Sequence, residues 1–248
     1  MALLAATGLR KQFGEVHAVD GVDFSIAPEQ LVSLVGSNGA GKTTLVNLIT
    51  GLVRPDGGQI LFQGRDVTLL PVYDRIKAGI ARSFQLVNLF DALSVEDNVR
   101  LAIFSRENKV RRAMSLAESD AEAKEETRAV VEEFGLTDRW DVPAGGLAQG
   151  ERKLLDVAVA YALKPKLLLL DEPTSGVGTR EKSRIMDRIA SVVRSRGLSA
   201  MIVEHDMDIV FTYSDKIVVM HEGRVLAEGK PDQIATDDRV AAMLLRHG

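Results

Sequence analysis

"LVSLVGSNGAGKTTLVNLIT", residues 31–50, joins an apolar run, a glycine-rich loop and a helical pattern. The run "LVSLVG" predicts a buried strand, and "GKTTLVNLITGL" predicts the helix that follows it. The loop fits the pattern of glycine, four residues, then Gly-Lys-Thr, and its place between strand and helix gives that pattern its meaning. Glycines let backbone N–H groups face an anion, and a helix start adds partial positive charge. The stretch therefore predicts a phosphate-binding loop.

Two side chains of this loop have separate expected roles. Lys42 brings a full positive charge to the outer phosphates, and the hydroxyl of Thr43 suits Mg²⁺. The alternative, a glycine-rich turn with a chance lysine, is disfavoured because strand, loop and helix are all in place. The predicted nucleotide-binding residues are Gly36, Ser37, Asn38, Gly39, Ala40, Gly41, Lys42, Thr43 and Thr44.

A second buried strand ends in two acids, in "LLLLDEPTSG", residues 167–176. Strands of a parallel sheet present ligand-binding groups at their carboxyl ends, so Asp171 is expected to hold Mg²⁺ directly or through water. Alternation along an extended chain is expected to send the side chain of Glu172 elsewhere, toward the water that attacks the γ-phosphate. Pro173 helps to end the strand. The alternative is a strand that happens to end in a polar turn, and a phosphate-binding loop elsewhere in the chain disfavours it.

His205 follows another buried strand, "AMIVEH". A histidine at that strand end is able to hydrogen-bond the γ-phosphate and help to hold the water. Taken alone, it is more ordinary as a surface histidine.

The composition limits the classes of protein to consider. The 248 residues are 46% hydrophobic and 27% charged, and 31 basic against 35 acidic residues give a net charge of −4. This balance argues against broad, sequence-independent binding of nucleic acid. The absence of cysteine excludes disulfides and thiolate metal sites.

The start of the chain, "MALLAATGLRKQFG", lacks a basic segment ahead of its apolar one. It is expected to form an edge strand rather than a secretion signal. The longest apolar runs fall far short of the roughly 18 residues that a membrane helix needs, so no membrane span is expected.

Strands and helices alternate along most of the chain, which predicts an α/β fold with a largely parallel sheet and helices on both of its faces. Hairpins are expected with turns at Gly64 and at Glu222-Gly223, and a single domain is expected over 1–248. A C-terminal tail, approximately 229–248, is expected to form two short helices.

A mostly helical part is expected over approximately 94–160. Ser94 with Asp97 forms a capping-box start, and "AEAKEETRAVVEEFG" ends at the helix-stopping Gly135. A basic cluster in this part is expected to be a solvated face, with contact to a partner or to lipid headgroups as the alternative. Its members are Arg106, Lys109, Arg111 and Arg112.

Together these residues resemble the nucleotide-binding subunits of ABC transporters, over essentially the whole chain. Residues 36–44 match the Walker A loop of that family, and Asp171 with Glu172 matches its Walker B aspartate and catalytic glutamate. The remaining matches are Gln85 with the Q-loop glutamine, "LAQGE" (147–151) with the signature LSGGQ, "SGVG" (175–178) with the D-loop, His205 with the switch histidine, and Phe13 with an aromatic residue that stacks on adenine.

The resemblance implies a P-loop NTPase cassette with a RecA-like parallel-sheet core, an N-terminal antiparallel β subdomain and a helical signature subdomain. It implies ATP and Mg²⁺ as cofactors. The implied catalytic residues are Glu172, His205 and Gln85, and the implied metal-binding residues are Thr43, Gln85 and Asp171. The signature residues implied to contact nucleotide are Ala148, Gln149, Gly150 and Glu151.

Two departures from the family pattern stand out. Ala148 and Gln149 replace the serine and first glycine of the signature, so Ala148 offers no hydroxyl to a γ-phosphate. Weaker but retained anion binding is expected there, because the helix that follows still begins with N–H groups. Gly178 replaces the usual aspartate of the D-loop.

The family architecture implies the partners. Two cassettes pack head to tail, and each ATP lies between the Walker A loop of one chain and the signature of the other. The second cassette is either a second copy or a paralogue. Transmembrane permease subunits are implied as direct partners at the cytoplasmic face of the membrane, with a substrate-binding protein as an indirect partner and no nucleic acid.

Further stretches, such as "GIARSFQLVNLFDALSVEDNV" and "GRVLAEGKPDQI", resemble the importers of branched-chain or hydrophobic amino acids, a group that includes urea and amide importers. The cargo is not identified by this likeness. A permease helix is expected to dock on some of five apolar residues: Phe84, Leu86, Leu89, Phe90 and Leu93. Ordinary packing is the alternative for each of them.

Three other functions remain open. A soluble ABC ATPase acting on nucleic acid or ribosomes usually carries tandem cassettes or long insertions. A P-loop kinase for a small molecule leaves Glu172, the signature and His205 unexplained. A cassette for lipid or lipopolysaccharide export is not excluded by the length of the chain.

Overall fold

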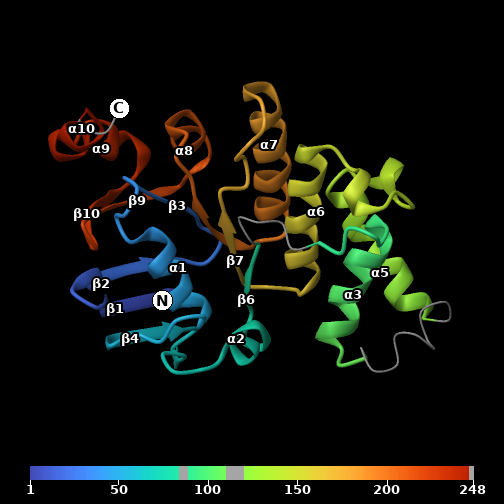
Figure 1. Ribbon diagram of the computed structural model, residues 1–248, viewed down its shortest axis with the longest axis horizontal. Coiled ribbons are helices and arrows are strands. Elements are labelled where there is room, and N and C mark those ends of the chain that lie inside the picture. The colour runs from blue at the N-terminus through green and yellow to red at the C-terminus, as the bar shows by residue number, and fades with distance from the viewer. Residues whose placement is uncertain (84–88, 110–119, 246–248) are drawn as a thin grey trace. The chain divides into compact units, whose positions relative to one another are not determined.

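The computed structural model of the protein describes residues 1–83, 89–109 and 120–245. The chain forms two compact units. The first unit combines Met1–Ala78 with Gly197–Gly248, and the second is Gly79–Arg196. The elements of both are coloured along the chain in Figure 1.

An antiparallel sheet opens the first unit. Its strands, in spatial order, are β2 (Val16–Ile26), β1 (Leu4–Phe13), β4 (Gly57–Phe62) and β5 (Arg65–Asp66). The expected hairpin with Gly64 in its turn is therefore present. The prediction of an edge strand for the start of the chain is wrong, because β1 pairs with β2 on one side and β4 on the other. Alternating polarity shows which face of a strand is buried, and it carries no information about the strand's two edges.

A second group of strands in this unit is parallel. β3 (Leu31–Gly36) lies between β8 (Ser199–Val203) and β9 (Lys216–His221) and runs parallel to both. β10 (Arg224–Gly229) returns antiparallel to β9, which confirms the hairpin predicted at Glu222-Gly223. All five residues of β8 are buried, as are the first five of β3. Such uninterrupted burial is typical of parallel strands that are covered on both faces.

Five helices belong to the described part of the first unit. They are α1 (Lys42–Thr50), α2 (Val72–Ala78), α8 (Met207–Tyr213), α9 (Pro231–Ala235) and α10 (Asp238–Leu245). The two short helices predicted for the tail are α9 and α10, which lie beside β10 in Figure 1. They contribute Ile234, Val240 and Met243 to a core cluster that includes Ile217 and Val219 of β9.

A buried arginine fixes the end of α1. Arg75 of α2 is 1% exposed. One terminal nitrogen of its guanidinium donates to the carbonyls of Leu48 (2.5 Å) and Ile49 (2.6 Å). The other terminal nitrogen donates to the carbonyl of Thr68 (2.7 Å), and Nε donates to that of Leu70 (3.0 Å). Burial lowers the pKa of Arg75 to about 10, so the side chain stays charged at neutral pH. It therefore supplies donors to the last carbonyls of α1, of which that of Leu48 also accepts the N–H of Gly51 at 3.3 Å.

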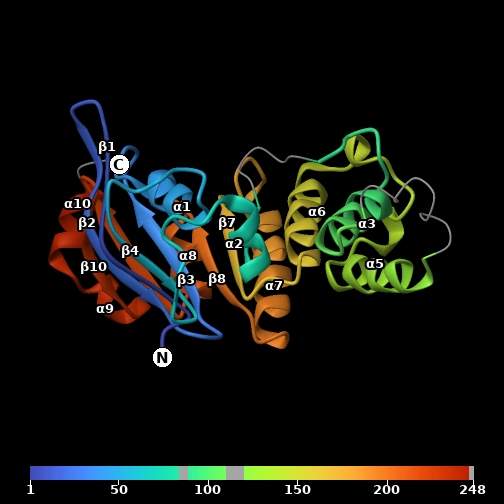
Figure 2. The ribbon, with the colours of Figure 1, turned by 90° about the horizontal axis from the view of Figure 1, so that it is seen from below.

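The second unit combines a parallel strand pair with helices. β6 (Ile80–Arg82) pairs with β7 (Leu167–Asp171), all of whose residues are buried. The α-helices of its described residues are α3 (Val95–Arg106), α5 (Ala121–Glu133), α6 (Gln149–Ala162) and α7 (Thr179–Ser195). Helices α3, α5 and α6 pack together, as Figure 2 shows. The antiparallel sheet, the parallel strands and the helical part confirm the predicted α/β class.

The predicted helix ends are present in this unit. The hydroxyl of Ser94 accepts the N–H of Asp97 at 3.0 Å, and Gly135 follows α5 with a φ of 70°. The basic cluster is ion-paired where it is described: Arg106 contacts Glu126 at 2.6 Å and Lys109 contacts Asp120 at 2.8 Å. Arg111 and Arg112 lie outside the described residues.

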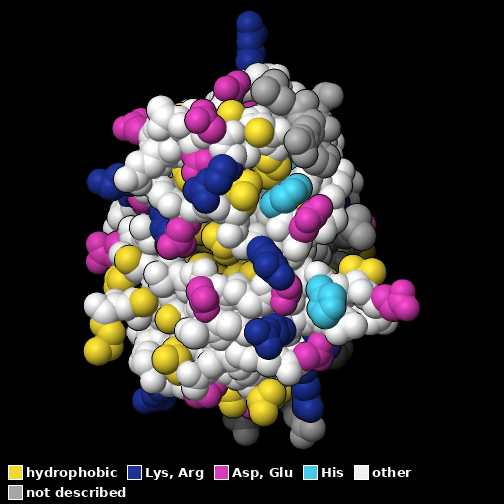
Figure 3. All heavy atoms as spheres, turned by 90° about the vertical axis from the view of Figure 1, so that its left-hand side faces the viewer, with side chains coloured by type: hydrophobic (Ala, Val, Ile, Leu, Met, Phe, Trp, Pro, Cys, Tyr) yellow, Lys and Arg dark blue, Asp and Glu magenta, His cyan; other side chains and the backbone are white. Residues whose placement is uncertain are grey.

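Within the ranges that the structure describes, every helix is too short or too polar to cross a membrane. On the face of the first unit seen in Figure 3, acidic and basic side chains intermingle and apolar ones are scattered. This mixture agrees with the nearly balanced charge of the sequence.

Candidate functional site

The glycine-rich loop connects β3 to α1, as the sequence predicts. Lys42, the first residue of α1, is only 7% exposed. Its ammonium donates to the carbonyls of Gly36 (2.7 Å) and Ser37 (3.0 Å), so the loop curves around it. Asn38, Gly39 and Thr43 are exposed, whereas Ala40 is buried and Thr44 is partly buried.

Gly41 meets two constraints at the start of α1. Its φ of 97° lies in the left-handed region, which favours glycine. A Cβ on this residue would also collide with the carbonyl oxygen of Ala18 in β2. The backbone N–H groups of the first turn of α1 have no side-chain cap at Gly41, which suits an anion as their partner.

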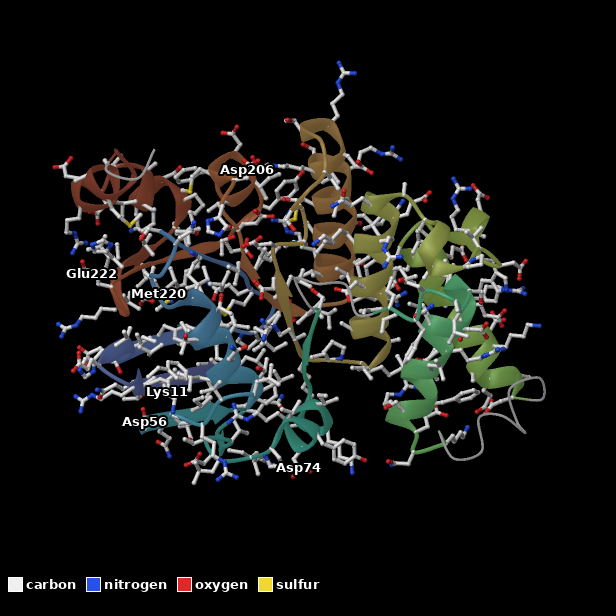
Figure 4. All side chains as sticks on the ribbon, in the orientation of Figure 1. Lys11, Asp56, Asp74, Asp206, Met220 and Glu222 are labelled. Carbon is white, nitrogen blue, oxygen red and sulfur yellow. The ribbon has the colours of Figure 1, made fainter. Side chains whose placement is uncertain are left out.

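The turn between β9 and β10 is hydrogen-bonded to the glycine-rich loop. The N–H of Gly223 donates to the carbonyl of Ala40 at 3.1 Å, and the carbonyl of Gly223 accepts the N–H of Asp20 at 2.9 Å. Met220 and Glu222 mark this end of β9 in Figure 4. Sequence reasoning predicted the turn but missed its contact with the loop, because the two segments lie far apart along the chain.

His205 leaves the sheet at the same edge as the loop. β3 and β8 run parallel, with Leu34 opposite Val203, so the residues after both strands emerge on one side. The side chain of His205 is exposed, and the main-chain N–H of His205 donates to the carboxylate of the buried Glu204 at 3.0 Å. Asp206, labelled in Figure 4, then precedes α8.

Phe13 is the last residue of β1 and is half exposed. The ammonium of Lys11 lies 5.3 Å from the centre of the Phe13 ring and pairs with Asp56 at 2.8 Å. Figure 4 labels both residues of this pair. An exposed aromatic face beside a cation suits a flat, electron-rich ring such as a nucleobase.

In the second unit, Asp171 ends β7 and is 3% exposed. Arg82 of β6 pairs with its carboxylate at 2.5 Å. Glu172 has a φ of 49°, so the extended chain stops one residue before it. The reason predicted for the direction of its side chain, alternation along a strand, is therefore wrong. A left-handed turn directs Glu172 instead, and for a non-glycine residue this conformation costs about 1–2 kcal/mol.

The segment 147–151 forms the start of α6. The N–H of Ala148 donates to the carboxylate of Glu151 at 3.0 Å, and the same carboxylate accepts from Arg139 at 2.8 Å. Ala148 is the N-cap and has no side-chain oxygen, so no side chain caps the first turn from that position. Ala148, Gly150 and Glu151 border a hollow of about 560 Å³, together with Glu181, Arg184 and Ile185 of α7.

Gln85 lies outside the described residues, as do Phe84 and Leu86 of the expected docking cluster. Phe90 is 61% exposed, which leaves its ring available to a partner. Leu89 and Leu93 are partly buried.

The described residues fit Mg²⁺ and a nucleotide by their chemistry. Thr43 and Asp171 offer the hydroxyl and carboxylate oxygens that Mg²⁺ prefers, and nucleotide phosphates commonly complete such a site. No cluster of three or more acidic or histidine side chains capable of holding a metal by itself occurs in the described ranges.

Comparison with known proteins gives one family. The sequence profile described as ABC transporter matches residues 19–175. The chain is 35% identical over 237 residues to the high-affinity branched-chain amino acid transport ATP-binding protein BraF of Pseudomonas aeruginosa, covering 94% of this chain and 93% of BraF. It is 33% identical over 246 residues to the corresponding protein LivG of Escherichia coli, covering 96% and 95%.

Solved structures of similar fold indicate the same family. The ADP conformation of MJ1267, an ATP-binding cassette of an ABC transporter, superposes with a TM-score of 0.87 at 29% identity and covers 99% of both chains. A nucleotide-free ATP-binding cassette from an ABC transporter gives a TM-score of 0.86, also at 29% identity, covering 98% of this chain and 99% of its own.

Proposed function

Because this chain belongs to the ABC transporter family of ATP-binding proteins, whose members hydrolyse ATP to power transport, we propose that it is the motor subunit of an amino-acid importer. Its cargo is a branched-chain or other small amino acid, or a related amide. The observation that carries this proposal is the likeness to BraF and LivG, which extends over more than nine-tenths of each chain. These relatives favour neither lipid export nor a soluble ATPase, and membership of the family argues against a small-molecule kinase.

Different residues of the site are proposed to bind the phosphates, to hold the metal ion and to orient the attacking water. The amides of 36–44 and the ammonium of Lys42 bind the phosphates. Thr43, Asp171 and Gln85 would hold Mg²⁺, which would neutralise charge on the phosphates. This assignment is supported by the loop's closure around Lys42 and by the burial of Asp171 at a strand end.

Hydrolysis needs a group that orients the attacking water. Glu172 is proposed to orient or deprotonate it, and His205 to hydrogen-bond the γ-phosphate. Gln85 is proposed to link the metal to the membrane partner. Phe13 is proposed to stack on adenine, for which its half-exposed ring is suited.

The start of α6 is proposed to face the nucleotide of a second cassette, which is either a copy or a paralogue. Ala148, Gln149, Gly150 and Glu151 form this surface. Its support is the first turn of α6, whose N–H groups are not capped by the side chain of Ala148. ATP then joins two chains, and its hydrolysis lets them separate.

The chain is proposed to act at the cytoplasmic face of the membrane, bound to permease subunits and served indirectly by a substrate-binding protein. Uptake of labelled leucine, isoleucine and valine tests this. Cells whose only copy of the chain carries Lys42→Ala are expected to lose uptake, and the wild-type copy is expected to restore it. Unchanged uptake of these amino acids with lost uptake of an amide would correct the cargo. Unchanged uptake of both classes would refute the importer.

A further inference from the structure

A buried lysine of helix α6 forms hydrogen bonds to the turn that follows β7. Lys153 of α6 is 6% exposed. Its ammonium donates to the main-chain carbonyl of Glu172 at 3.1 Å and to the hydroxyl of Ser175 at 2.9 Å. The N–H of Ser175 donates to the same carbonyl at 3.1 Å. Two donors therefore converge on the carbonyl of Glu172, and an ammonium with three N–H groups is able to reach both acceptors.

The backbone at Glu172 needs such restraint. Its φ of 49° is unfavourable for a residue with a side chain, and this conformation persists only where the surroundings impose it. A buried ammonium is likewise unfavourable unless it is hydrogen-bonded. The hydrogen bonds from Lys153 restrain the backbone at Glu172 and also provide the buried ammonium with acceptors.

The first turn of α6 contacts the same segment at two more places. A Cβ at Gly176 would collide with the side-chain amide of Gln149, and one at Gly150 would collide with the carboxylate of Glu181. The start of α6 and the segment 172–181 are thus packed directly against each other within the second unit. Movement of one is therefore resisted by the other.

We propose that Lys153 is a positioning residue for Glu172. It fixes the main chain that carries the catalytic carboxylate, and it joins that residue to the helix whose first turn faces the second cassette. The inference rests on the proposed function, in which Glu172 orients the attacking water. Lys153 itself touches neither nucleotide nor water in this proposal.

The test is the steady-state hydrolysis of ATP by the full chain, with kcat and KM measured separately. Lys153→Met keeps a long buried side chain but removes the donors. It is expected to lower kcat about tenfold or more while KM changes by less than about threefold, because the phosphate contacts of 36–44 are untouched. Lys153→Arg, which retains donors, is expected to recover part of kcat. Lys124→Met, at an exposed position of α5, is the matched control and is expected to leave kcat unchanged.

Ser175→Ala removes one of the two acceptors and is expected to lower kcat by a smaller factor. In the Lys153→Met background it is expected to add nothing, because the bond is already lost. A kcat equal to that of the wild type in a folded Lys153→Met variant overturns the proposal. It is also overturned if the loss of kcat in the double variant equals the product of the losses in the two single variants. If thermal unfolding shows that Lys153→Met does not fold, Ser175→Ala decides, and an unchanged kcat in that variant overturns the proposal.

Glu172→Gln separates this inference from the function on which it rests. Near-normal hydrolysis by Glu172→Gln removes the proposed role of Glu172 itself. Lost hydrolysis in Glu172→Gln, combined with normal hydrolysis in Lys153→Met, removes only the positioning role of Lys153.

Discussion

The main-chain N–H of Gly223 donates to the carbonyl of Ala40 at 3.1 Å, so the turn between β9 and β10 holds the glycine-rich loop between β3 and α1. Gly223 has a φ of 76°, and a Cβ built on it would lie 2.7 Å from the carbonyl oxygen of His17. The contact therefore leaves no room for a side chain.

Gly223→Ala is expected to weaken ATP binding and to lower the midpoint of thermal unfolding. Gly64→Ala is the matched control, because Gly64 has a φ of 75° but open space where a Cβ would be. Both substitutions carry the cost of a left-handed alanine, about 1–2 kcal/mol. The clash at Gly223 adds about 1–3 kcal/mol. Calorimetric titration with ATP checks the prediction, and equal ATP affinity in the two variants would contradict it.

Lys42→Ala is expected to weaken ATP binding by a factor of about 10 to 150. The estimate corresponds to the loss of a hydrogen bond to a charged group, about 1.5–3 kcal/mol. Lys77→Ala, on the exposed side of α2, is the control for removal of a lysine. Equilibrium binding of a fluorescent ATP analogue measures both. An affinity equal to that of the wild type in Lys42→Ala would remove this lysine from the phosphate site.

Glu172→Gln is expected to bind ATP normally and to lower turnover by about 100-fold or more, because the amide cannot accept the proton of the attacking water. ATP-bound dimers are then expected to persist on a sizing column, provided that the second cassette is another copy. Glu132→Gln, on the exposed side of α5, serves as the control. Near-normal hydrolysis in Glu172→Gln would assign the catalytic role to another residue.

Removal of Mg²⁺ with a chelator is expected to stop hydrolysis, and Asp171→Asn is expected to raise the Mg²⁺ concentration needed for half-maximal rate. The amide keeps the shape of the side chain but loses the charge that attracts the cation. Asp171→Asn also leaves Arg82, its partner at 2.5 Å, without that carboxylate. A fall in thermal stability is therefore expected as well. An unchanged dependence of the rate on Mg²⁺ would exclude Asp171 from the metal site.

Phe90→Asp is expected to prevent co-purification with the permease subunits while ATP binding by the isolated chain is unchanged. The backbone of Phe90 is fixed by Asn98, which accepts its N–H at 2.9 Å and donates to its carbonyl at 3.2 Å. Phe90 as a whole is 61% exposed. Val16→Asp, at a 66% exposed position of β2, is the control. Intact assembly in Phe90→Asp would place the docking surface elsewhere.

The fold was largely predictable because its signals are local. Unbroken apolar runs gave the parallel strands, and Ser94, Gly135 and the turn at Glu222-Gly223 gave boundaries that the structure confirms. The neighbours of β1 were not predictable, because pairing with β4 depends on a return of the chain after α1. Sequence alternation on one strand does not report that return.

The candidate site likewise has features that were predictable from local sequence and features that were not. The loop 36–44 and the placement of Asp171 at a strand end follow from local patterns, and the structure bears out both positions. The left-handed backbone of Glu172, its bond from Lys153 and the support of the loop by Gly223 did not follow. Each depends on tertiary contacts between residues that are distant in sequence, for which composition and periodicity give no signal.

The guanidinium of Arg75 has a mechanical consequence for the helix that it caps. Helix ends ordinarily fray, but the carbonyls of Leu48 and Ile49 at the end of α1 are anchored to a buried side chain. A nine-residue helix secured in this way has no loose final turn to absorb a displacement. We therefore expect a displacement at the first turn of α1 to move the whole helix as a rigid element.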